Sequence, residues 1–437
     1  MTALAPPRLR ATTVEITDET DAGAGLLDHV PEHLRSTSLS CWIREGDGLI
    51  GWGRVGHYLS RGSDRFDAAE QWWDEVCTQA HVEDPVGLPG TGLVTFGSFS
   101  FSAQSRDESR LVVPAVIIGR RAGRVWRTTI VDEAQPEAAP PTTPDSNSDV
   151  SGTITIEPGS IPAAQWPHVI SQAVGRIESG QLHKVVLARD ELARADGPID
   201  VRRVLRRLSE RYDATWTFAV DGLVGATPEM LVRLVEGRVH SRVLAGTVRR
   251  DQAPGSLVAE DHPDFRAEHH VDPRLRLISS GKDLEEHAYA VRSVAEALAP
   301  HCRDLQVPDE PFVLKLPDVY HLASDISGDH VGGATSLRLA AALHPSAAVC
   351  GTPSEPAAAL ISELEGMDRG RYAGPVGWMD HSGEGDWGIA LRCGELCEDQ
   401  VTMRLFAGGG IVAASDPEAE LAETEIKLAA MRYALEA

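Results

Sequence analysis

Lys184 and Glu229 are ionisable residues whose surroundings could prepare them for proton transfer. Lys184 precedes the apolar run Val-Val-Leu at 185–187. If it faces inward, desolvation would lower its pKa, which suits a general base; the alternative is that it faces solvent on the polar side of a strand. Glu229 ends the segment Gly-Ala-Thr-Pro-Glu at 225–229, after a turn that follows a strand. If it is partly buried, its pKa would rise and it could donate a proton; the alternative is an ordinary turn carboxylate.

A second set of charged residues lies near the C-terminus. Glu420, Glu423 and Lys427 are spaced three and four residues apart, which on a helix places them on one face. The preceding segment Ser-Asp-Pro-Glu at 415–418 is typical of a helix start, with a capping residue followed by proline. The glycines at 408–410 are expected to form a turn that lets the backbone approach a ligand. The alternative is a solvated helix face with a salt bridge between residues i and i+4.

A further acidic segment, Lys-Asp-Leu-Glu-Glu-His, occupies residues 282–287. Glu286 could be a ligand of Mg²⁺, because hard cations prefer carboxylate oxygens. The alternative is a capping box in which Asp283 caps a helix and Glu286 lies three positions further on. His269 and His270 have no partner at the spacing of a metal site, and we interpret them as incidental.

The elements that would position these residues mix strand and helix patterns. They interleave without the regular strand–helix–strand order of a Rossmann fold, so the sequence predicts an α+β fold with large antiparallel β-sheets flanked by helices. The predicted helices cover residues 67–77, 284–298, 356–369 and 417–435. The predicted strands cover residues 92–101, 111–119 paired as a hairpin with 123–127, 184–189, 216–220, 388–392 and 401–406.

Composition shifts suggest three segments. A strand-rich part covers residues 1–132, a stretch rich in proline and small polar residues covers 133–150, and the region that carries the candidate residues covers 151–437. The middle stretch is predicted to be a flexible surface connection. The segment 249–280 is long and polar, and its role, as a lid or otherwise, is left open.

The bulk composition excludes several classes of protein. A net charge of −24 argues against nucleic acid as a partner, because a phosphate backbone requires a basic surface. We find no apolar run long enough to cross a membrane and no secretory signal. The six cysteines are scattered without a Cys-x-x-Cys pair, which favours reduced thiols in a cytoplasmic protein. An anionic substrate would therefore need a local cluster of cations or a metal ion.

Residues from about 153 to 435 resemble the chorismate-utilising family of isochorismate, anthranilate, aminodeoxychorismate and salicylate synthases. Each matching segment is weak evidence alone, but ten in the right order are specific. In chain order they are 184–189, 225–229, 244–247, 282–287, 320–322, 343–353, 369–378, 390–393, 407–411 and 415–418.

The resemblance implies roles for the charged residues. Glu286 and Glu423 would bind Mg²⁺, with Glu420 holding a metal-bound water. Arg392 and Lys427 would bind a substrate carboxylate. The other residues that the resemblance places at the substrate are His321 near the ring, Leu244, Ala245, Gly246, Ala348, Val349, Gly408, Gly409 and Gly410. In the family the glycine segment usually reads Gly-Ala-Gly, and glycine at position 409 is expected to have a small effect.

Within the family, the sequence is most similar to isochorismate synthases, which are isomerases. Lys184 would deprotonate a water that attacks ring carbon 2 of chorismate, and Glu229 would protonate the hydroxyl leaving carbon 4. Ala348 supports this interpretation, because members that use ammonia, and salicylate synthases, typically carry threonine there. Lys184 also points away from the anthranilate type.

The alternatives within the family are a salicylate synthase and an amidating synthase that needs a glutaminase partner. The N-terminal part has no tryptophan-type regulatory signature, so no glutaminase is expected. The resemblance implies one sandwich of β-sheets between helices, with the proline-rich stretch as a surface excursion, and a chain that acts as a monomer. The product would feed the biosynthesis of menaquinone or of a siderophore.

Overall fold

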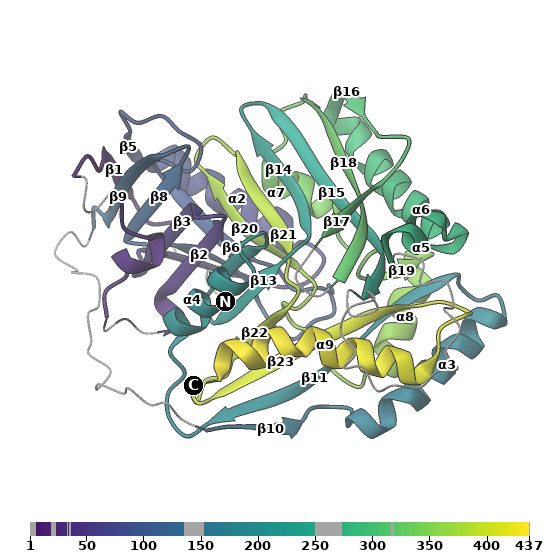
Figure 1. The fold of residues 1–437 in the computed structure, drawn as a ribbon. Coiled ribbons are helices and arrows are strands. Elements are labelled where there is room, and N and C mark those ends of the chain that lie inside the picture. The colour runs from purple at the N-terminus through teal and green to yellow at the C-terminus, as the bar shows by residue number, and fades with distance from the viewer. Residues whose placement is uncertain are drawn as a thin grey trace, which may run out of the picture.

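The computed structural model describes residues 6–18, 23–32, 34, 36–134, 153–249, 273–315 and 319–436. These residues build two large β-sheets with helices against them (Figure 1). Among the described strand pairs, all are antiparallel except β1 with β5. The predicted class, α+β with large antiparallel sheets flanked by helices, is confirmed.

The larger sheet has 13 strands in the described part of the chain. Its order is β10 (Ile154–Pro158), β11 (Lys184–Ala195), β23 (Thr402–Ile411), β22 (Cys393–Leu396), β13 (Leu223–Thr227), β12 (Trp216–Val220), β2 (Leu39–Arg44), β3 (Asp47–Trp52), β8 (Val116–Arg121), β9 (Arg124–Asp132), β1 (Leu9–Glu15) and β5 (His81–Glu83), and β19 (Gly351–Thr352) also pairs with β11.

The smaller sheet has 10 described strands. Its order is β16 (Cys302–Gln306), β18 (Val319–His330), β15 (Arg238–Arg249), β14 (Met230–Val235), β21 (Gly385–Ile389), β20 (Pro375–Asp380), β6 (Val94–Ser98), β7 (Ser109–Val113) and β4 (Gly56–Ser60), and β17 (Phe312–Lys315) also pairs with β18. Both sheets place strands from either side of residues 135–152 next to each other, since β12 pairs with β2 and β20 pairs with β6.

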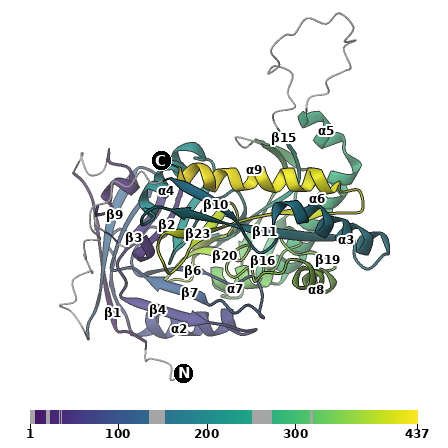
Figure 2. The ribbon, with the colours of Figure 1, turned by 90° about the horizontal axis from the view of Figure 1, so that it is seen from below.

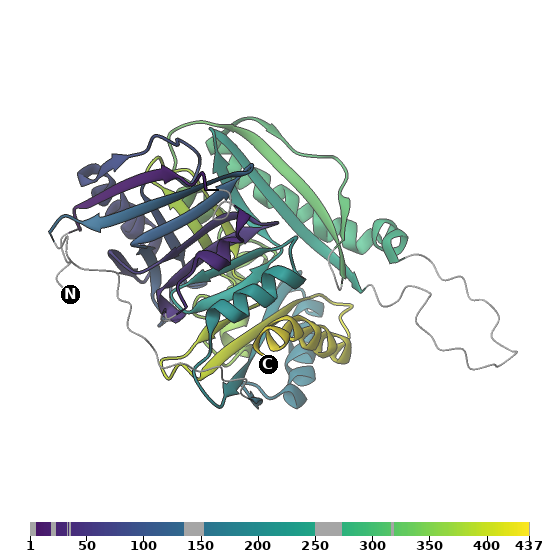
Figure 3. The ribbon, with the colours of Figure 1, turned by 60° about the vertical axis from the view of Figure 1, so that its left-hand side comes forward.

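Helices cover the outer face of each sheet (Figure 2). Those on the larger sheet are α3 (Trp166–Glu178), α4 (Val201–Arg211) and α9 (Pro417–Leu435), of which α4, in teal, and α9, in yellow, lie in front in Figure 3. Those on the smaller sheet are α2 (Arg65–Gln79), α5 (Pro273–Ser279), α6 (Gly281–Leu298) and α7 (Ser336–Leu343), while α8 (Ser354–Leu364) packs on β11 and β19.

Apolar burial between these layers holds the fold together. A first cluster fills the space between the sheets and beneath α2, α6 and α7, with Trp126, Trp378 and Trp387 fully buried. A second cluster lies between the larger sheet and helices α4 and α9, and it includes Leu205 and Leu428. The second cluster fixes the face that each of the helices α4 and α9 presents to the larger sheet.

Local signals predicted the helices at both ends of the chain well. Helix α2 extends the predicted 67–77, with Trp72, Trp73 and Val76 buried as expected. Helix α9 has the predicted bounds, and the side chain of its N-cap Asp416 accepts a hydrogen bond from the amide of Ala419. Helix α6 begins at Gly281 rather than at 284, so Asp283 lies inside the first turn and the capping-box alternative is wrong.

Several predicted elements differ in extent from the observed ones; the strand predicted at 92–101, for example, is β6, Val94–Ser98. The run 111–119 is not one strand, because the chain passes at Pro114 from β7 in the smaller sheet to β8 in the larger. The predicted helix 356–369 ends at Leu364, and Gly366 follows with a positive φ of 61° that breaks the helix. The predicted strand 388–392 ends at Ile389, and Arg392 has a left-handed φ of 49°.

The glycines at 408–410 do not form the predicted turn. They lie inside strand β23, paired with Val186, Leu187 and Ala188 of β11. Local glycine content favours a turn, but the pairing with a distant strand overrides it. Of the segment 249–280, residues 273–279 form helix α5, and residues 250–272, with His269 and His270, lie outside the described residues. Among the described helices, none is both long and apolar enough to cross a membrane.

Candidate active site

A cavity of about 310 Å³ opens where β11, β23, the β13–β14 connection, β15, β18 and α9 meet. The structure brings to it every sequence-predicted site residue but one. They are Lys184, Glu229, Leu244, Ala245, Gly246, His321, Ala348, Val349, Arg392, Gly408, Gly409, Gly410, Glu420, Glu423 and Lys427. The exception is Glu286, which belongs to α6 and whose side chain lies outside the described residues.

Glu229 is buried in the cavity wall, only 8% exposed, so it is not a solvated turn carboxylate. Its backbone amide donates to the hydroxyl of Thr227, and its carbonyl accepts from the amide of Ile389. Burial raises the pKa of Glu229 to about 7, although Lys184 and Lys427 each lower it somewhat. A carboxyl group with such a pKa can be protonated near neutral pH and can donate its proton.

Lys184 begins β11 and lies on the cavity side of the sheet rather than facing bulk solvent. Its side chain runs along β23, because a Cβ placed on Gly410 would meet Lys184 Cε at 2.9 Å. The strand β11 pairs with β23 from Val185 onward and with β19 at Lys184 itself. The amine therefore enters the cavity from a strand that is held on both sides.

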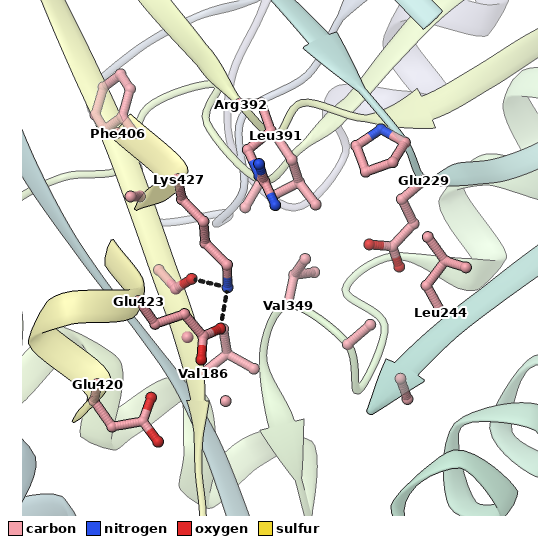
Figure 4. Close-up of a pocket in the computed structure, with 18 of the residues that line it drawn as sticks. Val186, Glu229, Leu244, Val349, Leu391, Arg392, Phe406, Glu420, Glu423 and Lys427 are labelled. Carbon is pink, nitrogen blue, oxygen red and sulfur yellow. Dashed lines mark hydrogen bonds and ion pairs between the residues drawn. The ribbon is translucent and has the colours of Figure 1, made fainter. Parts of the chain in front are cut away.

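The charged face of α9 turns into the cavity. Lys427 Nζ lies 2.6 Å from Glu423 Oε1 and donates to the carbonyl of Gly408 at 2.7 Å (Figure 4). The spacing of these residues also predicts, as the alternative to a binding site, an i,i+4 salt bridge on a solvated helix face. The salt bridge is present, but its two residues line the cavity. The Lys427 ammonium is the largest cause that holds the pKa of Glu423 below its usual range. Figure 4 shows Glu229 on the other side of the cavity from this face.

The carboxylates of α9 are suited to a hard cation. Glu420 and Glu423 lie one turn apart, and their oxygens converge on Gly409, where an added Cβ would lie 3.0 Å from Glu420 Oε2 and 3.8 Å from Glu423 Oε1. Carboxylate oxygens are the protein ligands that Mg²⁺ prefers. Among the described residues no group of three His, Cys, Asp or Glu forms a metal site. The third predicted carboxylate, that of Glu286, is outside that set.

His321 is a neutral group in the wall. It is 9% exposed, and burial, helped by the charges of Arg392 and Lys427, lowers its pKa to about 3. An imidazole that stays neutral can hydrogen-bond to a ligand without competing with the cations for its negative charge. Arg392 lines the same cavity from its left-handed position after β21.

Several lining residues were not predicted from the sequence. They are Val186, Pro228, Arg369, Tyr372, Ala373, Leu391, Phe406, Ala407, Val412 and Ser415. Tyr372 stacks on Phe406 with ring centroids 4.9 Å apart, which closes one side of the cavity. The segment 369–378 resembles the family, but no local pattern in it indicates which of its side chains face the cavity.

The three glycines of β23 lie close to different neighbours. A Cβ on Gly408 would lie 2.7 Å from the backbone oxygen of Leu187, which cannot move without separating β11 from β23. A Cβ on Gly410 would press on Lys184 Cε.

A series of alanine variants should separate these constraints. Gly409→Ala is expected to leave kcat within about twofold, because the neighbouring Glu420 Oε2 is the end of a flexible side chain. Gly410→Ala should lower kcat roughly tenfold by displacing Lys184. Gly408→Ala should cost roughly 1–3 kcal/mol of stability through overpacking. Steady-state kinetics and urea unfolding check all three, and equal effects at the three positions would contradict the geometry.

Comparison with known proteins places the chain in a class. Residues 42–436 match the family model described as chorismate binding enzyme. The chain belongs to the family of chorismate-binding enzymes. Within it, the chain is 40% identical over 278 residues to the isochorismate synthase DhbC of Bacillus subtilis, an alignment that covers 61% of this chain and 66% of that protein.

Longer alignments give the same picture. The chain is 31% identical to the isochorismate synthase MenF of Bacillus subtilis, covering 89% of this chain and 85% of the relative. The solved structure of DhbC from Bacillus anthracis matches with a TM-score of 0.71 and 30% identity, covering 94% of this chain and 98% of that one. The family that the sequence resembled is therefore confirmed.

Proposed function

We propose that this enzyme is an isomerase that converts chorismate to isochorismate, adding water at ring carbon 2 and releasing the hydroxyl of carbon 4 as water. The observation that carries the proposal is the placement of Lys184 and Glu229 in one cavity, Lys184 at the start of β11 and Glu229 in the connection between β13 and β14. A reaction that takes a proton from one water and gives a proton to another leaving group needs a base and an acid in one site. The names of the relatives support the same activity.

The two residues would divide the proton transfers. Lys184, as the neutral amine, would accept a proton from the attacking water. Glu229, protonated below about pH 7, would donate its proton to the departing hydroxyl. Both waters are accounted for, because one enters at carbon 2 as the other leaves from carbon 4.

Chorismate is a dianion, and the chain carries a net charge of −24. We propose that Arg392 and Lys427 bind its carboxylates beside Gly408–Gly410, while His321 contacts the ring. The walls are completed by Leu244, Ala245, Gly246, Ala348 and Val349. In a partly enclosed cavity such cations act in a lower dielectric than in water, which offsets the repulsion from the acidic protein.

We propose Mg²⁺ as the cofactor, because Glu420 and Glu423 offer the carboxylate oxygens that this ion prefers. Glu423 and Glu286 would hold the ion directly and Glu420 through a water, and the bound ion would supply positive charge beside the substrate carboxylate. We further propose that the enzyme acts in the cytoplasm as a monomer, without a glutaminase partner, and that its product enters menaquinone or siderophore biosynthesis.

Product analysis tests the function. Purified protein is incubated with chorismate and Mg²⁺ without ammonium, and the products are separated against authentic standards. Isochorismate should accumulate to equilibrium with chorismate and should disappear when EDTA is added. Salicylate with pyruvate would instead assign a salicylate synthase, and a product formed only with ammonium would assign an amidating enzyme. Absence of turnover under all conditions would contradict the proposal.

A further inference from the structure

One edge of β11 lacks a neighbouring strand beside the cavity. Strand β19 pairs only with Lys184 and Val185, and β10 pairs only with residues 191–195. On the opposite edge β23 pairs with β11 without interruption over residues 185–194. On this edge the amide of Val186 still donates to the carbonyl of Cys350 at 2.8 Å, but the described strand pairs leave the Val186 carbonyl and residues 187–190 without a ladder, shortly after the proposed base.

The buried ion pair of Arg369 and Glu365 binds the backbone of β11 along this edge. Arg369 Nη2 donates to the carbonyl of Val186 at 2.7 Å, and Glu365 Oε1 accepts from the amide of Ala188 at 2.8 Å. Arg369 Nε and Nη2 also donate to the Glu365 carboxylate, at 2.9 Å to Oε2 and 2.5 Å to Oε1. The two side chains thus supply a donor for the Val186 carbonyl and an acceptor for the Ala188 amide, backbone groups that a neighbouring strand would otherwise bind.

The same pair also binds the backbone of a second residue that lines the cavity. Arg369 Nη1 donates to the carbonyl of Val349 at 2.9 Å, and the Phe101 ring lies 4.2 Å from the guanidinium carbon. Val186 and Val349 both line the cavity. The side chains of Arg369 and Glu365 are 3% and 1% exposed, so bulk water does not compete for these hydrogen bonds.

We infer that Glu365 and Arg369 are positioning residues, which complete the edge of β11 and thereby hold Lys184 and the Val349 wall in their working geometry. The inference rests on the proposed function. A buried ion pair contributes little net stability, because desolvation offsets its attraction, whereas its directional hydrogen bonds fix backbone groups in place. Lys184 lies two residues from the Val186 carbonyl that Arg369 binds, so a shift of this strand moves the amine.

The chain offers a matched control two residues away. Arg371 is 1% exposed and donates to Glu395 Oε1 at 2.6 Å and to the carbonyl of Val220 at 2.9 Å. It is therefore, like Arg369, a buried arginine with a carboxylate partner and a backbone acceptor, although Glu395 is 21% exposed, and it is not among the residues that line the cavity. Arg371→Lys reports the loss of stability that follows from disturbing such a pair away from the site.

The experiment compares Arg369→Lys with Arg371→Lys in the full-length protein with Mg²⁺. Both variants should lower the melting temperature. Only Arg369→Lys should lower kcat for chorismate, by roughly 10- to 100-fold as expected for misplaced reacting groups, with KM within about threefold of wild type. Glu365→Gln, which keeps the acceptor for Ala188 but removes the charge, should give a smaller fall in kcat and provides the test if Arg369→Lys does not fold.

The outcomes separate the two hypotheses. An active wild type in which Arg369→Lys and Glu365→Gln keep a kcat within about twofold contradicts the positioning role alone. A fall in kcat that is equal in Arg369→Lys and Arg371→Lys assigns the effect to general destabilisation and also overturns it. A wild type without turnover contradicts the proposed function, and the inference fails with it.

Discussion

Replacing Lys184 by alanine is expected to lower kcat for chorismate by roughly 10²- to 10⁴-fold, the range that general acid–base groups contribute. The amine enters the cavity from the first residue of β11, and we propose that it takes a proton there from the attacking water. KM should change much less than kcat, because other cations, Arg392 and Lys427, are proposed to hold the carboxylates. Steady-state kinetics with Mg²⁺ measure both constants.

Two further variants make this prediction specific to proton transfer. Lys184→Arg keeps a positive charge but cannot act as a base near neutral pH, so it should be nearly as inactive as Lys184→Ala. His183→Ala changes the exposed residue immediately before β11 and should leave kcat within about twofold. If Lys184→Arg retains activity near that of wild type, the residue contributes charge rather than base catalysis.

The parts of the site that sequence reasoning predicted are those set by local signals. The cap and proline of α9 and the spacing of Glu420, Glu423 and Lys427 depend on neighbouring residues, and the helix has the predicted bounds. This helix face carries the salt bridge and also lines the cavity, because Lys427 pairs with Glu423 inside the cavity. A spacing argument alone cannot distinguish a solvated face from a cavity face.

The parts that were missed depend on contacts between distant segments. The glycines at 408–410 form a strand because β11, more than 200 residues earlier, pairs with them. Arg369 and Glu365 are only four residues apart in the sequence. The carbonyls to which the arginine donates, however, belong to the distant residues Val186 and Val349. To predict such roles, one must know which residues of distant strands pair with each other, and local periodicity does not carry that information.

Glu229→Gln is expected to abolish most activity and, at the same time, to stabilise the metal-free protein above pH 7. The loss in kcat should be roughly 10²- to 10⁴-fold, because glutamine cannot give a proton to the departing hydroxyl. The wild-type kcat/KM should fall as the pH rises above about 7, where Glu229 loses its proton, and the residual activity of the variant should lack this alkaline limb.

The gain in stability follows from the direction of the pKa shift. Burial raises the pKa of Glu229 from 4.5 to about 7, so between these values the folded protein keeps a proton that the unfolded chain has released. The free energy of unfolding therefore falls as the pH rises through this window and levels off above it. The neutral amide of glutamine avoids this cost, which is at most on the order of 3 kcal/mol.

Urea unfolding of the metal-free wild type and of Glu229→Gln at pH 5, 6, 7 and 8 measures this difference. The stability advantage of the variant should grow from pH 5 to pH 7 and stay constant at pH 8. Glu236→Gln, the same substitution at an exposed turn between β14 and β15, should show no such trend. An advantage that is absent at pH 8 would mean that Glu229 carries its charge in the folded protein without cost, and Glu229 would then be ionised at neutral pH and unsuited to the role of general acid.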